Sequence, residues 1–244
     1  MSYAPYLFAA IVALAGGAFR GFAGFGSGLL MVPLVTLVFD PKVAVPAMVL
    51  VALMGDVRLL PEVRREVNVR RVLSIGAPAL LCLPLGIAML AFVDPVVLRR
   101  VISGAIVVLV ALLAMGARFR SADRLGVLVP VGGVSGVLTG VAGIGGPPVV
   151  LTFLSLNEPA TQMRANLIAY FSMTGLAALV MMLLAGISPA MEVLPLFAAI
   201  APCFLLSLHF GAKAFHASTK DHYRRTAMGF LIFVALLGLV WPGP

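Results

Sequence analysis

Long apolar runs and short polar connectors alternate along nearly the whole chain. Six of the runs contain about 17 to 25 residues, enough to cross a hydrocarbon core of about 30 Å as a helix. They cover residues 43–60, 71–93, 96–117, 161–185, 190–212 and 225–241. The pattern therefore predicts an all-α integral membrane protein with these six runs as its full spans.

Four shorter apolar runs form two pairs, at 5–39 and 125–156, and a glycine-rich segment separates the members of each pair. The first member has about 15 residues and the second about 10. At about 1.5 Å per residue, the second member reaches only about half the membrane. Each pair could be one broken span or a re-entrant hairpin that enters and leaves on the same face. Length favours the hairpin, because about 35 residues is far more than one crossing needs.

The basic residues of the connectors test these two alternatives independently. If each pair is one crossing, Lys and Arg divide eight against eight between the two faces. If each pair is a hairpin, they divide three against thirteen, the asymmetry that orients membrane proteins with their basic loops inside. Only Arg20 remains outside the connectors in this count. The hairpin model places loops 61–70, 118–124 and 213–224 in the cytoplasm and both termini outside it.

The hairpin model also divides the chain into two repeats, 1–119 and 120–244, each a hairpin followed by three spans. Because three is odd, the second repeat enters the membrane from the opposite face, so the repeats are inverted. Inverted repeats bring the two hairpin tips together near the midplane, where transporters built in this way bind their substrates.

One glycine motif, Gly-x-Ala-Gly-x-Gly, occupies both hairpin tips, at Gly21–Gly26 and Gly140–Gly145, 119 residues apart. Glycine allows positive φ and close backbone approach, and the helix that resumes after each motif starts with its positive end and free N–H groups. Two such opposed starts would form a cradle for an oxyanion. Alternatively, the glycines serve only close helix packing. The candidate substrate-binding residues are Arg20, Gly21, Gly24, Gly26, Ser27, Gly28, Gly140, Gly143, Gly145, Gly146, Pro147 and Asn166.

Three polar residues within the apolar runs need separate interpretations. Arg20 at membrane depth costs roughly 2.5 to 3.5 kcal/mol on insertion scales, which an anion facing it would offset. The alternative is that it snorkels or pairs with backbone carbonyls at the broken helix. We interpret Asp56 with Arg58 as an interfacial pair, so no buried carboxylate stands out as a proton carrier. Asn166 could face the substrate or form a helix–helix hydrogen bond.

Composition agrees with a membrane location, since 62% of the residues are hydrophobic, 11% are charged and the mean hydropathy is +1.14. The net charge of +8 resides in connectors, which indicates topology and argues against nucleic-acid binding. Residues 1–5 lack the basic start of a cleavable signal peptide, so we expect the first apolar segment to remain. Cys82 and Cys203 have no metal-site spacing. No catalytic motif occurs, so we expect neither an enzyme nor a cofactor or metal.

The glycine motif lies near the start of each half, the second copy continues as Gly145-Gly146-Pro147-Pro148, and basic connectors join the segments of the two halves. In these features the chain resembles the TauE/SafE family of sulfite-exporter-type permeases. The resemblance covers nearly the whole chain. It implies an inner-membrane carrier that exports sulfite or a small organosulfur anion. The residues that it points to are Gly21, Gly24, Gly26, Gly140, Gly143, Gly145, Gly146 and Pro147. The first copy departs from the second, with Ser27 and Gly28 in place of Gly146 and Pro147, so the two half-sites differ chemically.

The sequence therefore predicts a membrane carrier that binds a small sulfur-containing anion at the midplane and works by alternating access. An anion channel and a non-transporting membrane scaffold are the alternatives. Its expected partners are the anion and the lipid bilayer. The identity of the anion, the direction of transport, the coupling ion and the oligomeric state, including a homo-oligomer, stay open.

Overall fold

The computed structural model describes residues 3–94, 123–156, 158–187 and 190–219, with a few further residues between 96 and 104 and between 222 and 229. All regular secondary structure in these residues is helical, as predicted. The predicted spans 96–117 and 225–241 fall largely outside the described residues. The helices are α1 (Ala4–Ala23), α2 (Ser27–Val35), α3 (Pro41–Val63), α4 (Val69–Phe92), α6 (Leu125–Ala142), α7 (Gly146–Ser155), α8 (Ala160–Leu184) and α9 (Ala190–His216), with the short 3-10 helix η1 (Arg64–Glu66) after α3.

Six of the described helices are long and apolar enough to cross a membrane. Four of them, α3, α4, α8 and α9, coincide with predicted spans. The other two, α1 and α6, have 20 and 18 residues and are longer than the predicted hairpin arms. The reason is local, because the first three residues of each glycine motif remain helical and extend the arm. The first member of each pair can therefore cross the membrane by itself.

Two glycines with positive φ end these long helices. Gly24 has φ 79° and Gly143 has φ 64°, in the left-handed region that favours glycine. The Gly24 N–H donates to the carbonyl of Arg20, and the Gly143 N–H donates to that of Thr139. The chain then starts a second, shorter helix, α2 with 9 residues and α7 with 10. Each motif thus separates a long helix from a short one.

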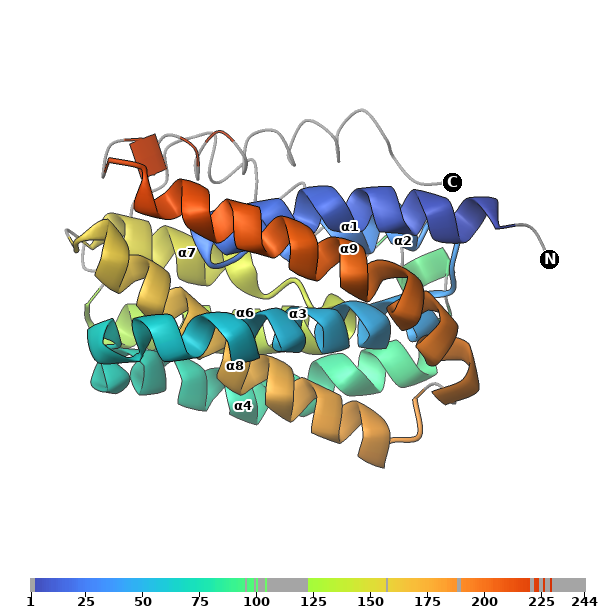
Figure 1. Ribbon diagram of the computed structural model, residues 1–244. Helices are drawn as coiled ribbons and strands as arrows, with labels where there is room; N and C mark the ends of the chain where they lie inside the picture. The colour runs from blue at the N-terminus through green and yellow to red at the C-terminus, as the bar shows by residue number, and fades with distance from the viewer. Residues whose placement is uncertain are drawn as a thin grey trace.

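The long helices lie roughly side by side in one bundle (Figure 1). In this view α1 leads away from the end where the N-terminus lies. The turn at η1 joins α3 and α4 at the opposite end of the bundle, on the left, and α8 and α9 meet at the end where the N-terminus lies, on the right. The re-entrant path of the two short helices and the inversion of the repeats stay predictions.

Glycines allow two helix pairs, α1 with α9 and α6 with α4, to pack closely. A Cβ atom at Gly21 would overlap the carbonyl oxygen of Leu208 in α9, and one at Gly140 would lie 2.6 Å from that of Leu83 in α4. On the partner helices, Cβ atoms at Gly211 and Gly86 would overlap the backbone of α1 and α6 respectively. At these two interfaces the glycines therefore serve close helix packing, and the backbones approach each other as in small-xxx-small contacts.

We expect Gly136→Ala in α6 to lower the melting temperature of the protein in detergent. The added Cβ would overlap the carbonyl oxygen of Ala79 in α4, and relief of such overpacking typically costs about 1–3 kcal/mol. Gly133→Ala on the same helix is the matched control. Its Cβ would make only an ordinary contact, 3.4 Å from the Cys82 sulfur, so the gain in helix propensity of up to about 1 kcal/mol should dominate. Equal melting temperatures for the two variants would contradict close packing of α6 on α4.

Candidate substrate-binding site

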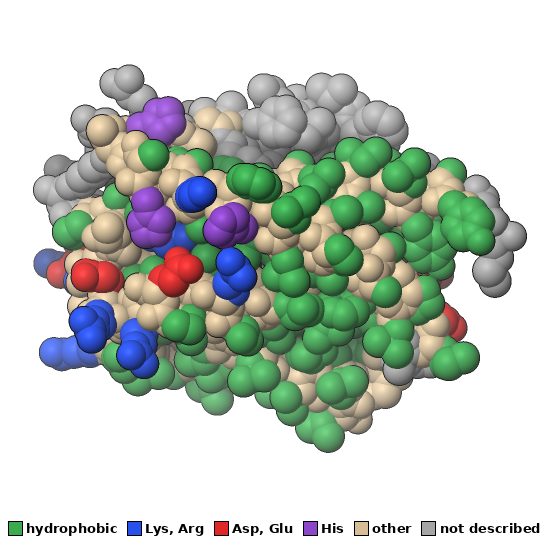
Figure 2. Space-filling view, in the orientation of Figure 1, with side chains coloured by type: hydrophobic (Ala, Val, Ile, Leu, Met, Phe, Trp, Pro, Cys, Tyr) green, Lys and Arg blue, Asp and Glu red, His purple; other side chains and the backbone are tan. Residues whose placement is uncertain are grey.

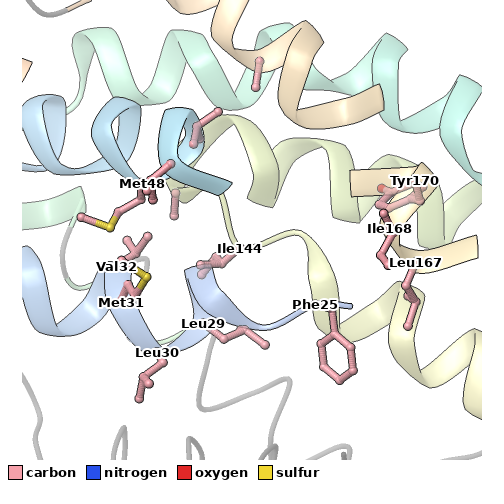
Figure 3. Packing of buried hydrophobic residues seen from close by; sticks show 14 of the residues in the cluster. Phe25, Leu29, Leu30, Met31, Val32, Met48, Ile144, Leu167, Ile168 and Tyr170 are labelled. Carbon is pink, nitrogen blue, oxygen red and sulfur yellow. The ribbon is translucent and has the colours of Figure 1, made fainter. Parts of the chain in front are cut away.

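The two glycine motifs, far apart in the sequence, meet in the interior of the bundle. A Cβ atom at Gly28, in the first turn of α2, would lie 2.6 Å from the carbonyl oxygen of Gly143 and 3.5 Å from Cγ2 of Ile144. Figure 3 shows Ile144 over the start of α2, where Leu29 and Leu30 are labelled. The start of the first short helix therefore contacts the second helix break directly.

Arg20, in the last turn of α1, forms a buried ion pair beside this contact. Its Nη2 donates to both carboxylate oxygens of Asp56, at 2.6 and 2.7 Å, and its Nε donates to Oδ1 at 3.2 Å. Its Nη1 donates to Oγ of Ser27 at 3.2 Å. The exposed fractions are 4% for Arg20 and 1% for Asp56. The first helix break thus carries a desolvated pair of opposite charges, α1 supplying the cation and α3 the anion.

The interpretation of Asp56 and Arg58 as one interfacial pair was wrong. Residues two apart on a helix do not face each other, and here they point to different surroundings. The Asp56 side chain is buried against Arg20, whereas Nη2 of Arg58 lies 3.3 Å from Nδ1 of His209 at the exposed surface. A buried carboxylate is therefore present at the glycine motifs, contrary to the sequence-based interpretation.

A cavity of about 40 Å³ lies against this ion pair, with room for about three water molecules. Polar groups from both breaks face it, together with the ring of Phe171, which lies 5.8 Å from the Arg20 guanidinium carbon. The lining residues are Arg20, Ser27, Gly28, Met48, Val49, Ala52, Leu53, Asp56, Thr139, Gly143, Phe171, Thr174 and Gly175. The cavity therefore combines a cation, a carboxylate, hydroxyl groups and an apolar wall.

Several lining residues occupy matching places in the two halves of the chain. Thr139 stands 119 residues after Arg20, and Gly175 stands 119 residues after Asp56. Matching positions thus contribute to one cavity, but the charges come only from the first half.

The two short helices also differ in the donors that they present. The first N–H groups of a helix have no partner within it, and α2 has no side-chain cap at its start. At the start of α7, Pro147 and Pro148 lack an N–H altogether. Ser27 and Gly28 line the cavity, whereas Gly146 and Pro147 do not. The two helix starts therefore present different donors, and the residues next to the cavity are those of α2.

The remaining predicted residues do not line the cavity. Gly21 and Gly140 lie in the helix interfaces described above. The other glycines of the motifs, Gly24, Gly26 and Gly145, shape the breaks without lining the cavity. Asn166 forms links away from the cavity: its side-chain oxygen accepts from the N–H of Asn68 at 2.7 Å, and its nitrogen donates to Glu158 at 3.2 Å. Asn166 thus joins α8 to two polar connectors.

Arg164 is a second buried arginine, so Arg20 is not alone inside the protein. The charge count assigned Arg164 to a cytoplasmic connector, but it lies within α8 with 1% of its surface exposed. Its Nη2 donates to the carbonyl of Gly21 at 2.7 Å, and the Tyr223 hydroxyl donates to that of Ala23 at 2.9 Å. The last turn of α1 has carbonyls without helical partners, and these two side chains satisfy two of them. The sequence signal that could have indicated burial of Arg164 is its position inside the apolar run 161–185, near the start of that run.

Hydroxyl groups hold the second break in place. The buried Tyr170 of α8 donates to Oγ of Ser135 at 2.8 Å, and Ser135 donates in turn to the carbonyl of Gly145. Thr139 donates to the backbone carbonyl of Ser135 at 2.8 Å. This support was not anticipated, because its members lie on different helices and no sequence motif joins them.

Comparison with known proteins identifies the family of the chain. A family model described as sulfite exporter TauE/SafE matches residues 8–237, nearly the whole chain. Neither a curated protein nor a solved structure gives a significant match. With its apolar helices and this match, the chain is a multi-pass membrane protein of a transporter family. The protein belongs to the TauE/SafE sulfite exporter family.

Proposed function

We propose that the protein is an exporter-type carrier of a small sulfur-containing anion, sulfite or a small organosulfonate, and that the anion binds in the cavity between the two helix breaks. The observation that carries this proposal is the set of donors at one place. The Arg20 guanidinium, the Ser27 hydroxyl and Gly28 in the first turn of α2 line one cavity, and the start of α2 has no side-chain cap. An oxyanion needs many donors, and a helix start with an arginine beside it supplies them.

The size of the cavity bears on the choice of anion. Room for about three water molecules favours sulfite and the smallest organosulfonates, such as methanesulfonate, over larger ones in this conformation. The Phe171 ring and the side chains of Met48 and Val49 form an apolar wall that makes no hydrogen bond to an anion. Selection by donors on one side and by volume on the other is typical of small-ligand sites.

We further propose that the bundle spans the inner membrane with its basic end in the cytoplasm and both termini on the other side. Figure 2 supports this orientation, because charged side chains gather at the end where α3 and α9 finish, and hydrophobic side chains cover the rest of this face. The inverted repeats also belong to the proposal, and the matched packing of α1 on α9 and of α6 on α4 supports them. Alternating access would then come from rocking of one repeat against the other around the cavity.

Counterflow in proteoliposomes tests the proposal. Vesicles loaded with unlabelled sulfite should take up radiolabelled sulfite transiently and several-fold faster than empty vesicles, because a carrier returns faster when loaded. A channel gives flux without this acceleration, and a scaffold gives no flux above that of protein-free vesicles. Arg65→Gln is the matched control for Arg20→Gln, because Arg65 is an exposed arginine of η1, away from the cavity. Loss of counterflow in both variants would contradict the assignment of the site.

A further inference from the structure

The Asp56 carboxylate accepts the hydrogen bonds of the Arg20 guanidinium that an anion would need. All the hydrogen bonds between Asp56 and Arg20 fall within 2.6 to 3.2 Å, and both side chains line the cavity. An anion that binds Arg20 must therefore displace the Asp56 carboxylate or lie beside it. The anion and the Asp56 carboxylate would then be neighbours in a site with little water, where two negative charges repel each other far more strongly than they would in solution. The ion pair thus balances the charges at the cavity in a way that opposes anion binding.

No second cation among the described residues relieves this repulsion. Around Asp56, α1 contributes Arg20, α2 contributes the Ser27 hydroxyl and α8 contributes the neutral side chains of Phe171 and Thr174. On the side of α9, Phe204 and Leu208 pack against Gly55, next to Asp56. Arg58 and His209 lie against each other at the exposed surface, and Arg164 is committed to the carbonyl of Gly21. The charge of the site therefore depends on Asp56 and Arg20 alone.

We propose that anion binding is coupled to protonation of Asp56. A proton from water binds a carboxylate oxygen of Asp56, the ion pair opens, and Arg20 turns its guanidinium toward the anion. The loaded cavity then holds one proton and one anion, so a monoanion leaves its net charge unchanged. This inference rests on the proposed function, because it assigns the coupling ion to the same site. The proton and the anion would cross together, so export requires an outward anion gradient that exceeds any opposing proton gradient.

Binding of methanesulfonate by the purified protein at a series of pH values tests the coupling. This sulfonate keeps a fixed charge between about pH 5 and pH 9, so any pH dependence belongs to the protein. In the wild type, affinity should fall about tenfold for each pH unit above the titration of Asp56, as expected for one linked proton. In Asp56→Asn, affinity should be independent of pH. Asp40→Asn, the same change at an exposed helix cap, should keep the dependence of the wild type.

Proton uptake by the wild type provides a second measurement, which does not depend on whether Asp56→Asn folds. Addition of methanesulfonate in weak buffer, at a pH where Asp56 is ionised, should remove about one proton from solution for each anion bound. Binding without proton uptake, or an Asp56→Asn variant with the pH dependence of the wild type, would overturn the coupling and leave the anion site standing. Failure of the wild type to bind sulfite and methanesulfonate at every pH would overturn the site and the coupling together.

Discussion

Replacement of Arg20 by glutamine is expected to abolish anion binding and counterflow. Glutamine keeps part of the side-chain length and two N–H donors but removes the charge and the bidentate geometry of the guanidinium. Loss of one partner from a buried charged contact costs at least about 2–5 kcal/mol, so affinity should fall by roughly a hundredfold or more. Calorimetric titration with sulfite measures the affinity, and the proteoliposome assay measures the flux.

The Arg20→Gln variant should also be less stable, which must be separated from the loss of binding. It leaves the Asp56 carboxylate buried without its partner, and removing one member of a buried ion pair typically destabilises a protein by about 3–5 kcal/mol. The double variant Arg20→Gln/Asp56→Asn removes both charges, so its melting temperature should return toward that of the wild type. Its anion binding should remain lost. A double variant that binds sulfite as tightly as the wild type would show that Arg20 serves only the fold.

The spans that the sequence predicts correctly are those whose apolar runs end at polar connectors, where the chain would pass from lipid to water. The apolar runs that became α3, α4, α8 and α9 stop at polar connectors, and the length of an apolar run decides whether a helix can cross the bilayer. The arms before the glycine motifs were predicted too short, because glycine was taken to end a helix. Gly21 and Gly140 remain helical since each packs under a neighbouring helix, and the helix ends only where φ becomes positive, at Gly24 and Gly143.

The candidate site was predictable as a region but not as a set of contacts. The repeated motif indicates where the backbone departs from regular helix, and the depth of Arg20 in an apolar run indicates a special environment. The partner of Arg20 lies 36 residues away, on another helix. Local spacing pairs Asp56 with Arg58 instead, although a helix points them in different directions. Asn166 and Arg164 likewise have partners far away in the sequence, because the tertiary fold decides which polar group each one meets.

Gly28→Ala should impair anion binding strongly, because Gly28 is where one break contacts the backbone of the other. The new Cβ would lie 2.6 Å from the carbonyl oxygen of Gly143, and backbone in a packed interior yields less easily than a side chain. Relief of such overpacking costs about 1–3 kcal/mol, and much of it should appear as displacement of the cavity wall and roughly a tenfold or greater loss of sulfite affinity.

Two further glycines make this prediction specific. At Gly146, the first residue of α7, an added Cβ would lie 3.3 Å from the ring of Phe171 and in ordinary contact with Leu29, and a ring edge can shift by a few tenths of an ångström. At Gly133 the added atom would make an ordinary contact. The loss of affinity should therefore be largest for Gly28→Ala, smaller for Gly146→Ala and absent for Gly133→Ala. If Gly28→Ala instead lowers the melting temperature while each folded molecule binds and transports sulfite normally, the two breaks meet for packing alone and the anion binds elsewhere.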